Sequence, residues 1–80
     1  MATLEAALAA APSARLVRDS LSVIVSQDLD GECAVTVLGS SVQLGPIHRC
    51  TSLAETQAYL ASGAVPRVLG DEHDWEPESD

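Results

Sequence analysis

The sequence contains no lysine and no phenylalanine, and its only two aromatic residues are Tyr59 and Trp75. Four arginines stand against 12 acidic residues, so the formal net charge is −8 and the sequence pI is about 4.3. Nucleic-acid binding requires a row of cations that neutralise phosphates. A composition with so few scattered cations therefore argues against direct nucleic-acid binding.

Long apolar runs and cysteines are scarce as well. No run approaches the ~20 residues that a membrane span requires. Residues 1–14 carry only one charge, Glu5, whereas a secretory signal starts with positive charge. Cys33 and Cys50 are the only thiols; they could form one bridge, but they do not make a disulfide-rich framework. We expect a cytoplasmic chain with reduced thiols, in which Cys33 is a small core residue.

What the sequence does contain is enough apolar material for one small domain. Its 80 residues are 46% hydrophobic, which separates it from a disordered acidic segment. A folded chain of this size buries only ~60% of the surface that its unfolded form exposes. A deep substrate cavity beside the core is therefore not expected, and we predict that the protein is not an enzyme.

The N-terminal third predicts helix. Residues 3–11 form a short amphipathic pattern, with Thr3 as the N-cap and Glu5 in the first turn, where negative charge suits the helix dipole. Pro12 interrupts this pattern. Residues 13–19 are ambiguous, and we interpret them as a second short helix that Pro12 opens.

The middle of the chain predicts three strands. Residues 20–27 alternate in hydrophobicity, and Asp30-Gly31 then indicates a hairpin to a second strand at 32–38. A third strand is predicted at 41–47. Because Pro46 cannot donate to a sheet ladder, this third strand is expected at an edge, bent or short.

A C-terminal helix is predicted over residues 53–62. Ser52 and Glu55 match a capping box, and the apolar segment 65–69 that follows is expected to pack back on the sheet. The predicted core consists of eight residues: Leu21, Val23, Val25, Val35, Val37, Leu44, Leu53 and Leu60.

These elements together predict an α+β fold of two layers. A three-stranded antiparallel meander would carry N-terminal and C-terminal helices in the order α-β-β-β-α. Residues 1–70 would form this single domain, and residues 71–80, with six acids and no base, would form an acidic C-terminal tail. An exposed edge strand leaves monomer and homodimer as open alternatives.

Chemistry-bearing residues are few. His48 and Cys50 lie two apart before the C-terminal helix, as a metal pair or an activated thiol would. A metal site needs three or four ligands, and the five glycines are isolated, so that no phosphate-binding loop exists. We therefore predict no catalytic residue, no metal and no cofactor, and interpret Cys50 as a loop thiol beside a surface imidazole.

The acidic tail offers the most distinctive candidate site. It is either a solvated end or a surface for a basic partner, in which Trp75 anchors the partner and the surrounding acids steer it. A second acidic patch lies at the hairpin. The predicted partner-binding residues are Asp71, Glu72, Asp74, Trp75, Glu76, Asp28, Asp30 and Glu32.

In length, pI and lack of a catalytic site, with an acidic cluster at residues 71–80, the chain resembles the small anti-CRISPR proteins of phages and mobile elements. The resemblance implies a non-enzymatic inhibitor of a basic, nucleic-acid-handling protein complex that acts by nucleic-acid mimicry. The alternative is an antitoxin-like or structural partner subunit that binds through the edge strand Val42–Leu44. Neither hypothesis involves a membrane or direct contact with nucleic acid.

Overall fold

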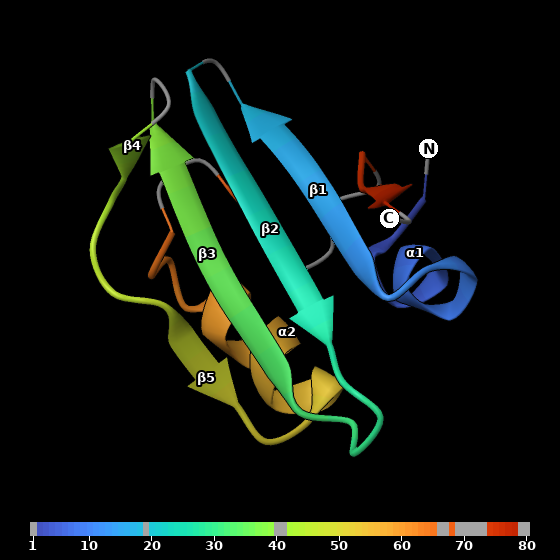
Figure 1. Cartoon of the computed structure of the whole chain (residues 1–80). Helices are drawn as coiled ribbons and strands as arrows, with labels where there is room; N and C mark the ends of the chain where they lie inside the picture. Colours follow the sequence, from blue (N-terminus) through green and yellow to red (C-terminus); the bar gives the residue numbers. More distant parts are fainter. Residues whose placement is uncertain (1, 19, 40–41, 66–67, 69–73, 79–80) are drawn as a thin grey trace.

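The computed structural model describes residues 2–18, 20–39, 42–65, 68 and 74–78 (Figure 1). The chain has an α+β fold in which every strand pairing is antiparallel. The sheet order is β4-β3-β2-β1-β6, and β5 pairs with β3 beside β4. The elements are α1 (Leu4–Ala10), β1 (Ser13–Arg18), β2 (Leu21–Gln27), β3 (Cys33–Gly39), β4 (Val42–Gln43), β5 (His48–Cys50), α2 (Leu53–Ala61) and β6 (Glu76–Glu78).

Helix α1 begins as predicted, but the segment after it does not. Thr3 Oγ1 accepts a hydrogen bond from the Ala6 N–H at 3.2 Å, which caps the helix. The expected second helix at 13–19 is wrong, because residues 13–18 form β1 and pair with β2 along their whole length. Ala14 and Leu16 are completely buried at a spacing of two, which is the period of a strand rather than of a helix.

The predicted hairpin between β2 and β3 is confirmed. Gln27 pairs with Cys33, and residues 28–32 form the turn. The Asp28 carboxylate accepts hydrogen bonds from the backbone N–H groups of Asp30, at 2.9 Å, and Glu32, at 3.0 Å. Gly31 has φ +87°, a left-handed conformation that glycine adopts without steric cost. The turn therefore depends on Asp28 and Gly31.

The third predicted strand is divided into two short ones. Residues 41–47 were expected to form one strand, whereas the structure has the two-residue β4 and the three-residue β5 on the same edge of β3. Gly45 and Pro46 separate them. Gly45 has φ +81°, which is not a strand conformation, and Pro46 has no N–H to donate to the ladder. With β1 and β6 added, the sheet has six strands, and the predicted three-stranded meander is corrected.

Helix α2 begins at its predicted cap. Ser52 Oγ accepts from the Glu55 N–H at 3.2 Å. The Glu55 carboxylate accepts hydrogen bonds from the backbone N–H and the hydroxyl of Thr51. In a capping box it would accept from the N–H of the N-cap residue, which here is Ser52. Figure 1 shows α2 behind the sheet, against β3 and β5, while α1 lies beside β1 and β6.

The described part of the predicted tail belongs to the fold. Glu76 to Glu78 pair with Arg15 to Ser13 of β1, and Trp75 forms an isolated antiparallel bridge with Ala2. The backbone hydrogen bonds of that bridge are 3.1 Å and 2.9 Å long. Both ends of the described chain therefore meet at the same edge of the sheet (Figure 1).

The core differs from the predicted one at its margins. Four of the eight predicted residues are buried. Three others, Leu21, Val37 and Leu53, are half-buried. The predicted burial of Leu44 is wrong, because this residue is 50% exposed. Val65 and Val68 are buried, which agrees with the expected packing of that segment; its other residues lie outside the described part. The buried hydrophobic residues are Leu4, Ala7, Leu8, Ala14, Leu16, Val23, Val25, Cys33, Val35, Cys50, Leu60, Val65, Val68 and Trp75.

Neither helix in the described ranges has the length or apolarity needed to cross a membrane.

Candidate functional site

Of the three acids near the C-terminus that the structure describes, Asp74 and Glu78 make ion pairs with arginines of this same chain. Arg15 Nε lies 2.6 Å from Glu78 Oε1, and Arg18 Nη2 lies 2.6 Å from Asp74 Oδ2. Arg18 also donates to the carbonyl of Val17, at 3.1 Å. These ion pairs join β1 to the C-terminal segment, so they hold the fold together at this edge.

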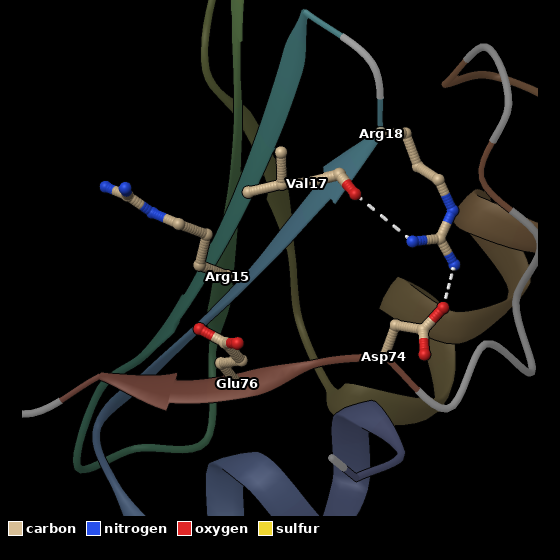
Figure 2. A pocket seen from close by; sticks show the side chains of 5 residues that line it. All are labelled: Arg15, Val17, Arg18, Asp74 and Glu76. Carbon is tan, nitrogen blue, oxygen red and sulfur yellow. Dashed lines mark hydrogen bonds and ion pairs between the residues drawn. The ribbon is translucent and has the colours of Figure 1, made fainter.

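A shallow hollow of about 290 Å³ lies beside these pairs. Figure 2 shows Arg18 turned towards Asp74, whereas the guanidinium of Arg15 points away from it. Val17 and Glu76 complete the lining. Because the hollow presents charges of both signs, it does not form the purely acidic surface that the sequence predicted around Asp74 and Glu76.

Trp75 is not an exposed anchor. Its side chain is completely buried in the cluster that contains Leu4 and Leu16. Its indole Nε1 finds no acceptor among the described residues. The expectation that Trp75 is exposed to water, available to a partner, is therefore corrected: in this fold the indole is part of the buried core.

The remaining predicted site residues do not form one patch. Asp28, Asp30 and Glu32 are exposed together at the turn of the β2–β3 hairpin. Asp74 makes an ion pair with Arg18. Arg18 pairs with Leu21, the first residue of β2, so this ion pair lies at the end of β2 opposite to the hairpin turn. Asp71 and Glu72 lie outside the described residues.

The acidic patch at the hairpin, formed by Asp28, Asp30 and Glu32, has an arginine, Arg49, beside it. A hollow of about 280 Å³ is lined by Asp28, Glu32 and Arg49, together with residues of β2 and β3. The Asp28 carboxylate is engaged by the backbone N–H groups of Asp30 and Glu32, whereas the carboxylates of those two residues make no described interaction within the turn. This patch can attract a cationic partner, but it is small.

His48 and Cys50 have structural surroundings. The imidazole of His48 stacks on the ring of Tyr59, with centroids 3.7 Å apart and planes 8° from parallel. Cys50 is 2% exposed, so the expectation of a loop thiol is wrong; it lies in β5 opposite Cys33. Within the described ranges, no three His, Cys, Asp or Glu side chains are grouped as metal ligands would be.

An apolar groove lies at the other edge of the sheet, between β3, the β4–β5 connection and α2. Its volume is about 380 Å³, and its lining includes Val35, Val37, Leu44, Ile47, His48 and Tyr59. Leu44 donates its N–H to the Val37 carbonyl at 2.8 Å, so the backbone still follows β3 at this point. Its side chain covers Gly39, where an added Cβ would lie 2.8 Å from Leu44 Cδ1.

Large apolar side chains stand exposed in the segment 42–47, and two of them, Leu44 and Ile47, line this groove. Val42 is 62% exposed, and Leu44 and Ile47 are each 50% exposed. We name these three residues the β4 surface. Sequence reasoning identified the edge strand but placed Leu44 in the core and gave Ile47 and Tyr59 no role. The available signal was the break at Gly45-Pro46, because it limits the strand to a few residues while apolar residues stand on both sides of it, Val42 and Leu44 before and Ile47 after.

No protein-family model, no curated protein and no solved structure matches this chain. Function is therefore inferred from the surfaces of the chain itself.

Proposed function

We propose that this chain is a cytoplasmic, non-enzymatic binding module that recognises a partner protein through the β4 surface. The observation that carries the proposal is that Val42, Leu44 and Ile47, within the segment 42–47 of the β4–β5 edge, are each at least half exposed, and that Leu44 and Ile47 also line the apolar groove. Contiguous exposed apolar side chains cost free energy in water, and in folded proteins they mark surfaces that another molecule covers. The role is that of a partner subunit or an antitoxin-like protein.

The backbone of this edge supports binding by strand addition. Among the described residues, the β3 edge is covered by two residues of β4, by the N–H of Leu44 and by three residues of β5, with Gly45 and Pro46 interrupting them. A partner strand added outside β4 would gain main-chain hydrogen bonds and bury alternate side chains of the β4 surface. Because this contact is apolar, its affinity should change little with ionic strength.

A second candidate function is the inhibition of a basic, nucleic-acid-handling protein complex, in the manner of an anti-CRISPR nucleic-acid mimic. It is favoured by the exposed acids of the hairpin, Asp30 and Glu32 above all, and by the net charge of −8. Such charges accelerate association with a cationic surface and are screened by salt. In this version Trp75 supports the fold and does not contact the partner.

Affinity capture from the host with three tagged proteins separates the two functions. The first is the wild type, the second carries V42D and I47D, and the third carries D30N and E32Q as the matched control on the other surface. We expect the V42D/I47D protein to lose a partner that the other two retain, and wild-type capture of that partner to survive ~1 M salt, where the Debye length is only ~3 Å.

Two other outcomes decide against the proposed function. Loss of the partner in D30N/E32Q alone, with release of wild type by salt, would transfer the function to the acidic hairpin. If both double variants capture the same proteins as wild type, neither surface is the binding site. Circular dichroism of each variant confirms that the fold is retained, since surface changes of this kind alter stability by only about 0.5 kcal/mol.

A further inference from the structure

The two cysteines of the chain face each other across a strand pair. Cys33 is the first residue of β3 and Cys50 is the last residue of β5, and the register of these antiparallel strands makes them direct partners. Directly opposed residues have Cα atoms about 4.5 to 5.5 Å apart, and their side chains lie on the same side of the sheet. Disulfides span Cα separations of about 4.4 to 6.8 Å. The register therefore places the two Cα atoms within the range of separations that disulfides span.

Both thiols are free and shielded from solvent. Each residue is 2% exposed, and both belong to the core cluster. The Gly31 carbonyl oxygen lies 3.9 Å from the Cys33 sulfur. Cys33 also lines the hollow of about 280 Å³ beside Arg49, so one side of the pair lies next to a surface depression.

We propose that Cys33 and Cys50 are a dithiol–disulfide couple, which low-molecular-weight disulfides such as oxidised glutathione close into an intramolecular bond that fastens β5 to β3. The proposal is independent of the β4 surface, because it requires no partner protein.

The reaction is thiol–disulfide exchange in two steps. One cysteine thiolate attacks a sulfur of oxidised glutathione, which forms a mixed disulfide and expels one glutathione thiolate. The second cysteine thiolate then attacks the protein sulfur of that mixed disulfide and expels the other glutathione. Two protein thiols become one disulfide, oxidised glutathione becomes two reduced molecules, and the two protein protons pass to the departing thiolates.

Access to the buried sulfurs comes from the edge position of β5. This strand has three residues and pairs only with β3 among the described strands. Short edge elements with few hydrogen bonds open locally at lower free energy than the centre of a sheet. Detachment of β5 carries Cys50 into solvent and uncovers Cys33 at the same time. The strand therefore controls whether the thiols are protected or reactive.

The experiment is oxidation of the purified full chain by excess oxidised glutathione, followed by alkylation under denaturing conditions and mass spectrometry. We expect a monomer that has lost the mass of two hydrogen atoms and takes up no alkylating agent. Its urea midpoint should rise relative to the reduced protein, because the bond restricts the unfolded chain between residues 33 and 50. C33S and C50S are the matched controls, and each should stop at the mixed disulfide with glutathione.

Three results would overturn the proposal. In the first, wild type retains stable glutathione adducts or forms only intermolecular dimers. In the second, the thiols stay reduced throughout. To separate slow access from unsuitable geometry, wild type is also oxidised in urea and refolded; a disulfide-bonded chain that refolds with a lower midpoint than the reduced chain is the third contradicting result.

Discussion

The two edges of the sheet differ in what covers them. At the β6 edge the chain covers itself: β6 pairs with β1, Trp75 is buried, and two arginines of β1 make ion pairs with Asp74 and Glu78. At the β4–β5 edge, short strands interrupted by Gly45 and Pro46 leave the β4 surface exposed. An unpaired edge invites pairing with another chain. At the first, closed edge the C-terminal segment of the chain covers part of β1, whereas the second, open edge carries the exposed apolar side chains on which the proposed binding role rests.

The largest expected effect is on the closed edge. Trp75→Ala removes the largest buried side chain and should lower the free energy of unfolding by about 3 to 5 kcal/mol, measured by urea denaturation. Trp75→Phe is the matched control and should cost less, because it keeps an aromatic ring and removes an indole N–H that has no acceptor among the described residues. Equal midpoints for Trp75→Ala and wild type would mean that the closed edge does not hold the fold together.

A smaller effect is expected beside the open edge. Ser52→Ala removes the acceptor that caps α2, immediately after β5, and should destabilise the protein by about 1 kcal/mol. Ser52→Thr keeps a hydroxyl oxygen and should lie close to wild type in the same urea titration. If Ala and Thr variants have the same midpoint, the cap does not contribute to stability.

The ion pairs of the closed edge should contribute less still. Arg15 and Glu78 are 41% and 37% exposed, so water and salt screen their attraction. A double-mutant cycle with Arg15→Gln and Glu78→Gln should give a coupling free energy of about 0.2 to 1 kcal/mol. The coupling should fall as salt is raised; a coupling that is independent of salt would contradict an electrostatic origin.

The smallest effect on folding should come from the β4 surface itself. Val42→Ser with Ile47→Ser should change the free energy of unfolding by no more than about 0.5 kcal/mol, since both side chains are already half exposed or more. Sedimentation at several concentrations should show any self-association of wild type reduced in this variant. A large loss of stability would show that these side chains serve the core, and the contrast between the edges would disappear.

Local signals explain which parts of the fold could be predicted. The hydrogen bonds of the Asp28–Gly31 turn and of the Ser52 cap join residues at most four positions apart, and both features were predicted correctly. Strand β1 was missed because Ala14 and Leu16 are its only buried positions, and Pro12 before them suits a helix start equally well. The β-structure of this segment comes from its pairing with β2, which local propensity does not encode.

The C-terminal segment was misjudged for the same reason at longer range. Glu76-Pro77-Glu78 has poor strand propensity, and a tryptophan among acids resembles an exposed anchor. Its tryptophan is buried in a core cluster that includes residues of α1 and β1, more than fifty positions earlier. The sequence predicted the open edge at Val42–Leu44. It did not predict the groove, because the groove depends on the stacking of Tyr59 of α2 against His48 of β5, which are brought together only by folding.

The bridge between Ala2 and Trp75 has a consequence for the order of synthesis. A ribosome makes the chain from its N-terminus, so the segment that completes the core is produced after every element it covers. Until Trp75 and β6 emerge, the nascent chain exposes the outer side of β1 as well as the β4–β5 edge. Stable folding is therefore expected to wait for the end of the described chain, and a ribosome stalled before Trp75 should hold a protease-sensitive intermediate with both sheet edges open.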